Sequence, residues 1–287
     1  MRKLFLLLLP FVVVIYSNTK VYGQNDVVHP TYLTTGTFYG VSPALKDIPA
    51  LTADELKVHE ERAMKKLLNK KLKTRSYPFA STALPNGPDE VWQREMGKTS
   101  GKAPLVNFDA QTSPYYPPDC NGTVGPSHYM QTVNCTYAIY NKAGTLLAGP
   151  TNLNTLFTGL PGATYNDGDP IVLYDEMADR WFVAEFSISG SNDYMLIAVS
   201  TTNDPTGTWY KYSFDVADTP DYEKFGVWPD GYYMGTNNDA GNDIYVFERS
   251  VILAGGASPK MVGFDNAWRP TTIDGFMCVP PVDNDGT

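Results

Sequence analysis

The sequence contains two stretches that decide its fold, Val227–Asn237 (VWPDGYYMGTN) and Val124–Asn134 (VGPSHYMQTVN). Each stretch has a short β-type run, a turn at a proline and an aromatic run that ends in asparagine. Between them, Ile171–Phe186 reads as a similar hairpin, with IVLYD before a turn and RWFVAEF after it. Short runs of β-branched and aromatic residues bounded by turn residues are typical of antiparallel hairpins.

The three hairpins recur at a constant interval. Their aromatic residues Tyr129, Trp181 and Tyr233 are 52 residues apart in both cases. Further short runs follow each hairpin and predict additional strands at Tyr137–Tyr140, Leu146–Gly149, Tyr194–Ser200, Trp209–Phe214, Ile244–Phe247 and Ile252–Gly255. Four short strands every ~50 residues predict an all-β, β-propeller-like repeat domain. A β-sandwich is the alternative, although it does not predict the same hairpin at equal intervals.

The predicted repeat domain covers residues 106–287. It comprises three four-stranded units and the start of a fourth near Asp265–Thr287. Because propellers close with about 4 to 8 blades, this count predicts either a fragment of a longer protein or closure through oligomerisation.

The N-terminus has the features of a secretory signal peptide over residues 1–23. Arg2 and Lys3 precede the apolar run Leu4–Ile15, and the small-residue site Val21–Gly23 follows. The apolar run is shorter than the roughly 20 residues that span a bilayer. The alternative is a buried or membrane-anchoring helix. We expect a mature chain that starts at Gln24, has no transmembrane segment and is secreted or displayed at the cell surface.

An N-terminal extension is predicted over residues 24–105. Gln24–Ala50 shows no sustained period and is expected to be irregular. A helix is predicted over about 52–75, because Thr52 and Glu55 have the spacing of a capping box. A linker rich in Pro, Ser, Thr and Gly follows over Ser76–Asp119.

The charge distribution restricts the possible partners. From Val106 to Thr287 there are 7 Lys and Arg residues against 22 Asp and Glu residues. Such a surface repels phosphates, so a nucleic acid partner is not expected. Cations and polar neutral ligands fit it better.

The three cysteines are few, but an exported chain permits disulfides. Cys120 and Cys135 flank the first predicted hairpin at similar distances from its turn, which makes a cross-hairpin disulfide the expected pairing. Cys278 is left over. The alternative is three reduced thiols.

Carboxylates are the best candidates for a binding or reactive site. Asp119, Asp169 and Asp221 each lie shortly before the first strand of a predicted hairpin and are expected to form a partial ring at one rim. Such a ring is suited to Ca²⁺, which takes oxygen ligands, or to the paired carboxylates of glycoside hydrolysis. The alternative is that each Asp only caps its own loop. Secondary candidates are Asp167, Asp175 and Glu185.

No established catalytic motif is found. The sequence lacks a phosphate-binding Gly-rich loop, a zinc-protease pair of histidines and a nucleophile-elbow serine. Two of the three histidines lie outside the predicted domain, which argues against a His-based triad. Catalytic residues are therefore not assigned.

Several motifs of the repeat resemble a known protein family. They are DPIVLYD (169–175), ADRWF (178–182), IAVS (197–200), DPTG (204–207) and FGVWPDGYY (225–233). Over about Val106–Thr287 the chain resembles a family of large, mostly uncharacterised exported bacterial proteins. The resemblance implies a propeller-like domain, often followed by Ig-like modules and a C-terminal sorting domain of the type IX secretion route. This chain differs in having Glu223 where the family pattern has Pro, and it carries no sorting domain.

Two functional hypotheses follow. The first is an exported or surface binding and adhesion module for a glycan or protein ligand. The second is a secreted glycoside hydrolase that uses Asp169 with a second rim carboxylate, either Glu185 or Asp221.

Overall fold

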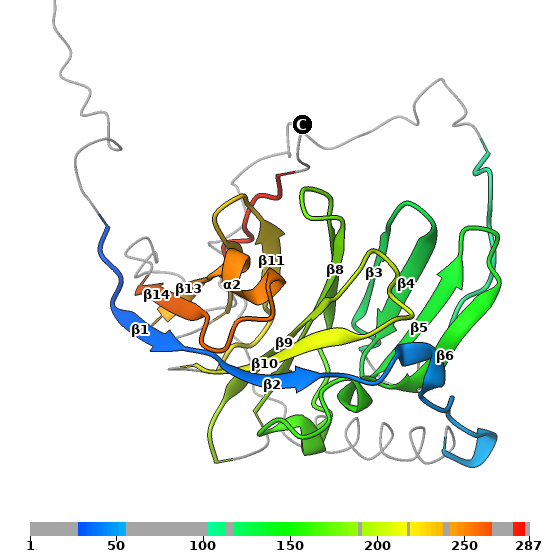
Figure 1. Ribbon diagram of the computed structural model, residues 1–287, viewed down its shortest axis with the longest axis horizontal. Coiled ribbons are helices and arrows are strands. Elements are labelled where there is room, and N and C mark those ends of the chain that lie inside the picture. The colour runs from blue at the N-terminus through cyan, green and yellow to red at the C-terminus, as the bar shows by residue number, and fades with distance from the viewer. Residues whose placement is uncertain are drawn as a thin grey trace, which may run out of the picture.

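The computed structural model describes residues 28–55, 103–112, 117–188, 191–216, 219–237, 242–265 and 278–284. In these residues fourteen strands form three antiparallel sheets, and helical structure is limited to short segments such as α2 (Arg249–Leu253) (Figure 1). The prediction of an all-β fold is confirmed. The three sheets lie face to face, with the second in the middle.

The first sheet follows chain order and consists of β3 (Cys120–Val124), β4 (His128–Val133), β5 (Thr136–Asn141) and β6 (Leu146–Asn152). Successive side chains of a strand point to opposite faces. Met130, Tyr137 and Ile139 therefore share the face that is buried against the second sheet.

The second sheet is buried on both of its faces. Its strands β7 (Ile171–Asp175), β8 (Arg180–Ser187) and β9 (Tyr194–Ser200) are followed by β10 (Trp209–Asp215). On β8, Trp181 and Val183 belong to the core shared with the first sheet, whereas Phe182 and Ala184 belong to the core shared with the third. Burial on both faces explains why β8 and β9 are apolar almost throughout.

The third sheet contains β11 (Lys224–Val227), β12 (Tyr232–Gly235), β13 (Asn242–Phe247) and β14 (Lys260–Asp265). The predicted strand at Ile252–Gly255 is wrong, because this stretch contains the end of α2 and a glycine at φ +68°. Ile252 still enters the core, but from a helix. A short apolar run does not by itself distinguish a strand from a buried helical turn.

The segment from Gln24 to Ala50 was predicted to be irregular, but it contributes two strands. β1 (Tyr32–Thr35) pairs with β14 and β2 (Thr37–Val41) pairs with β10, so the blue N-terminal segment in Figure 1 runs along the outer edges of the third and second sheets. Leu45 then inserts fully buried into the core between the second and first sheets. These strands are absent from the prediction because their partners are more than 150 residues away.

Other predictions lie at or beyond the limits of the described residues. The capping box is confirmed: Thr52 donates from its amide and its hydroxyl to Glu55, at 2.7 and 2.8 Å. The signal peptide, the rest of the predicted helix, residues 76–102 and 113–116 of the linker, and most of the predicted start of a fourth unit lie outside the described residues. Within the described ranges, no helix has the length and apolar character needed to cross a membrane.

Candidate functional site

The three aspartates predicted to form a ring lie in the loops that precede β3, β7 and β11. Each is partly buried. The carboxyl group of Asp169 is close enough to those of Asp119 and Asp221 for both to raise its pKa. The structure thus brings together one carboxyl group from each sheet at the end where the first strands begin.

The three loops share an uncommon backbone conformation. Asp119, Asp169 and Tyr222 have φ values of 43°, 49° and 56°, in the left-handed region that non-glycine residues rarely adopt. For a bulky tyrosine this conformation is unfavourable, and such residues persist only where the surrounding structure fixes them. The repeated geometry holds the aspartates close to the starts of the three first strands.

Asparagine side chains support two of the aspartates. Asn134, just after β4, donates from Nδ2 to Oδ2 of Asp119 at 2.9 Å. Asn237, just after β12, donates from Nδ2 to Oδ2 of Asp221 at 3.4 Å. The second sheet has no asparagine in that place, and its aspartate contacts another carboxyl group instead.

Asp169 is the chemically most perturbed of the three. Burial, together with the neighbouring Asp119 and Asp221, raises its pKa to about 7, and Lys224 opposes this shift. A neighbouring carboxylate disfavours the charged form of a carboxyl group. Asp169 therefore keeps its proton to a higher pH than an exposed aspartate does.

Glu223 belongs to the same cluster but was not predicted as a site residue. It lies one residue before β11, is 0% exposed, and neither of its carboxyl oxygens has a hydrogen-bond partner. Burial, followed by the charge of Asp169, raises its pKa well above the usual value. The available signal was its alternation with Phe225 and Val227, which places it on the side of β11 that faces the second sheet.

Glu185 lies at the same end, on β8, and is 1% exposed. Its Oε1 accepts a hydrogen bond from the Gly168 amide at 3.2 Å, while Oε2 has no partner. Burial raises its pKa to about 8. The adjacent Asp167 accepts a hydrogen bond from the Ile188 amide at 2.8 Å. We call Asp119, Asp169, Glu185, Asp221 and Glu223 the acidic rim.

Asp175 does not belong to the acidic rim. It ends β7, is 0% exposed, and forms a bidentate ion pair with Arg249 at 2.6 and 2.7 Å. The Tyr232 hydroxyl donates to it at 2.9 Å. Asp175 was a secondary candidate for the site. In the structure it forms a contact between the second and third sheets instead.

The cysteines are not in disulfide bonds. The register of the first hairpin pairs Cys120 with Val133, so Cys135 falls in the following turn, where its thiol donates to Asn134 Oδ1 at 2.7 Å. The cross-hairpin disulfide predicted for Cys120 and Cys135 is therefore not formed in the structure. The two cysteines were predicted to pair because they lie at similar distances from the turn at Pro126, but the strand register places Val133 and not Cys135 opposite Cys120.

The described residues contain no group of three or more His, Cys, Asp or Glu side chains arranged to hold a metal ion. Calcium binding at Asp119, Asp169 and Asp221 stays a prediction. As arranged, the acidic rim can accept hydrogen bonds from hydroxyl groups, and the proton of Asp169 can be donated to a bound ligand.

Comparison of the chain with models of protein families, with curated proteins and with solved structures finds no match.

Proposed function

We propose that this protein is an exported, β-propeller-like binding module whose acidic rim holds a polyhydroxylated ligand such as a glycan. The observation that carries the proposal is the convergence of carboxyl groups from three sheets at one end of the molecule. Strongly perturbed carboxyl groups gathered in this way are typical of functional sites.

The sheet topology supports the propeller-like assignment. Each sheet contains four strands that follow one another in the chain, and the N-terminal strands only add to the outer edges. The first strands β3, β7 and β11 lie near one another at the side of the rim. In a propeller the first strand of every blade lines the central channel, which would place the acidic rim at the mouth of that channel.

Hydroxyl-bearing ligands suit the chemistry of the rim. The carboxyl groups that a ligand can reach are those of Asp119, Asp169 and Asp221, which are only partly buried, whereas Glu223 and Glu185 are fully buried. Sugar hydroxyls donate hydrogen bonds without bringing a charge that must be desolvated. The amide groups of Asn134 and Asn237 add planar donors and acceptors beside the carboxyl groups.

A glycan array tests this proposal with the chain from Gln24 onward. We expect binding to at least one glycan, with affinity reduced about tenfold or more in Asp169→Asn, because one charge-assisted hydrogen bond contributes about 1.5–3 kcal/mol. Asp230→Asn, at an exposed turn, is the matched control and should bind normally. Binding that is unchanged in Asp169→Asn would exclude the rim as the site.

Export is tested separately. We expect the protein recovered from the culture medium of an expressing bacterium to begin at Gln24, because the predicted signal peptidase site ends at Gly23. N-terminal sequencing gives the answer. A chain that keeps Met1 and stays with the cells would overturn this part of the proposal.

The second candidate function, glycoside hydrolysis, is favoured by one observation. A pKa of about 7 allows Asp169 to keep its proton near neutral pH, as a general acid must. Asp169 would protonate the glycosidic oxygen, and Asp221 would take the proton of the attacking water. Glu185 suits the base less well, because its raised pKa of about 8 keeps it protonated at neutral pH. New reducing ends released from a bound polysaccharide, and lost in Asp169→Asn, would support hydrolysis. A bound glycan recovered intact would exclude it.

A further inference from the structure

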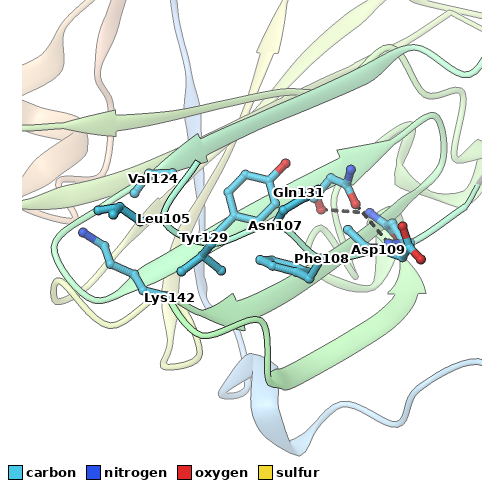
Figure 2. Close-up of a pocket in the computed structure, with 11 residues that line it drawn as sticks. Leu105, Asn107, Phe108, Asp109, Val124, Tyr129, Gln131 and Lys142 are labelled. Carbon is cyan, nitrogen blue, oxygen red and sulfur yellow. Dashed lines mark hydrogen bonds between the residues drawn. The ribbon is translucent and has the colours of Figure 1, made fainter. Parts of the chain in front are cut away.

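A groove of about 620 Å³ lies on the first sheet, outside the acidic rim. It runs between the segment Leu105–Gln111 and the outward face of the sheet, and Val124, Tyr129, Gln131 and Lys142 line it from the sheet (Figure 2). We call it the first-sheet groove. None of its lining residues was predicted as a site residue.

Hydrogen bonds fix the segment that forms one wall. The Gln111 amide donates to Gln131 Oε1 at 3.2 Å, and Gln111 Nε2 donates to the Gln131 carbonyl oxygen at 2.9 Å. The Thr136 hydroxyl donates to Gln111 Oε1 at 3.0 Å. The wall is therefore attached to the sheet by three bonds, and the groove is a preformed feature.

The floor of the groove is the ring of Tyr129. It stacks on Tyr140 at 6.2 Å, and Phe108 meets it edge-on at the same distance. The ring extends over Gly122 on the neighbouring strand, where an added Cβ would lie 2.6 Å from the tyrosine hydroxyl oxygen. The absence of a side chain at Gly122 thus lets a flat aromatic surface lie across the sheet.

Polar groups stand at both ends of this aromatic surface. Figure 2 shows Lys142 beyond one end of the Tyr129 ring, and Asp109 and Gln131 beyond the other. Because Gln131 Oε1 is already used by Gln111, the Nε2 group of Gln131 is left to donate, and it has no partner among the described residues. Asn107 and Asp109 are exposed beside it.

We infer that the first-sheet groove is a second binding site, one that takes a pyranose ring of a neutral oligosaccharide. A pyranose has an apolar C–H face that packs on an aromatic ring and a rim of hydroxyl groups that needs donors and acceptors at its edge. The groove provides both in this arrangement, consistent with the general composition of ligand sites. It is open to solvent at Leu105, so a longer chain can extend from it.

Other ligand classes fit the groove less well. An extended peptide adds to a sheet through unpaired backbone groups at an edge, whereas the floor here is a face formed by strands already paired, β3 with β4 and β4 with β5. A nucleic acid would bring phosphates to a domain with 7 basic and 22 acidic residues. A neutral sugar meets neither obstacle.

The first-sheet groove is separate from the acidic rim, and the two lie toward opposite ends of β3. The rim begins at Asp119, just before β3, whereas the groove lies toward Val124, where β3 ends. The inference therefore does not depend on the rim being a ligand site.

Three variants test the groove on an array of neutral gluco-, xylo- and manno-oligosaccharides, again with the chain from Gln24 onward. Tyr129→Ala removes the floor and should weaken binding about tenfold, the scale of a lost aromatic contact. Tyr129→Phe keeps the ring and should bind within about threefold of the parent. Gly122→Ala keeps every lining side chain but pushes the ring upward, so it should weaken binding without truncating any residue.

Thermal unfolding of each variant separates loss of binding from loss of the fold. Asp169→Asn completes the design. Binding that is weakened by Tyr129→Ala and Gly122→Ala but retained in Asp169→Asn supports the groove alone. Binding lost in Asp169→Asn and retained in the two groove variants overturns the groove and leaves the rim. If no neutral oligosaccharide is retained by the parent protein, the inference is wrong.

Discussion

The two ends of strand β7 both bury carboxyl groups, but they satisfy them differently. At its C-terminal end, Asp175 accepts four hydrogen bonds, two from Arg249, one from the Tyr232 hydroxyl and one from the Ala178 amide at 3.0 Å. The charge of Arg249 offsets the cost of burial. A buried carboxylate with a full set of donors is a structural element.

At its N-terminal end, about 20 Å away for six residues of extended chain, Asp169 contacts another carboxyl group instead of a cation. Glu185 receives one amide hydrogen bond and Glu223 none. Among the described residues, Lys224 is the cation whose charge lowers the pKa of Asp169. Carboxyl groups buried with so few donors destabilise the fold.

The two ends of β7 therefore differ in role. The contacts of Asp175 hold two sheets together, whereas the acidic rim leaves hydrogen-bond acceptors without donors. The Asp175 end joins the second sheet to the third through a complete set of contacts. The acidic rim retains unsatisfied acceptors at a cost in stability, which is the arrangement expected of a site that a ligand completes. Removal of a contact should therefore cost much more stability at the Asp175 end than at the acidic rim.

The largest effect of a substitution is expected from Asp175→Ala. It leaves the Arg249 guanidinium largely buried without its carboxylate, and removal of one partner of a buried pair costs about 3–5 kcal/mol. Urea unfolding at pH 7 measures the loss. Glu176→Gln, one residue away and exposed, is the control and should change the unfolding free energy by less than about 0.5 kcal/mol. A similar small loss in both variants would remove the structural role assigned to Asp175.

The stability of the parent protein should also depend on pH. The folded pKa values of Asp169 and Glu185, about 7 and about 8, lie above those of unfolded Asp and Glu, about 3.9 and 4.3. Between these values the folded state binds more protons than the unfolded state, so stability falls as pH rises. The loss is fully absent below about pH 4 and complete above about pH 8.

We expect the unfolding free energy to fall by about 6 kcal/mol between pH 5 and pH 8, since each group is linked to folding through its shift. Urea unfolding at a series of pH values checks this. Added Ca²⁺ is the informative second arm. A rise in stability at pH 8 that EDTA reverses would show that the rim binds the cation, and a rise in stability with pH in its absence would contradict the protonated rim.

The sequence predicts those features of the two ends of β7 that depend on residues close together in the chain. The hairpins carry turn residues beside their strands, and the aspartates before β3, β7 and β11 repeat with the hairpins, so their convergence follows from the repeat. Asp175 could not be separated from the rim candidates, because its partner Arg249 is 74 residues away. Glu223 was noted only as a departure from a family pattern. The strands β1 and β2 and the groove under Phe108 depend on long-range packing that no local pattern encodes.

A smaller effect is expected from Glu223→Gln. The amide cannot ionise in the unfolded state, so the variant lacks the part of the pH-dependent loss that Glu223 contributes. The fall in unfolding free energy between pH 5 and pH 8 should therefore be smaller in the variant than in the parent. Asp230→Asn, exposed at a turn, should leave the pH profile unchanged. A profile that stays as steep as that of the parent would show that Glu223 is ionised in the folded protein.

The smallest effect is expected from Asn134→Ala, which removes the amide that supports Asp119. Loss of this hydrogen bond should cost about 1 kcal/mol. Asn154→Ala is a matched control, because no hydrogen bond of the Asn154 side chain is present among the described residues. The expected loss in Asn134→Ala is informative when it is compared with the loss in Asp175→Ala at the other end of β7. If the rim is held open for a ligand, removing one of its few donors costs much less than removing Asp175, and the cost should decrease further once a glycan supplies hydroxyl donors. A loss as large as that of Asp175→Ala would instead make the rim a structural contact like the opposite end of the strand.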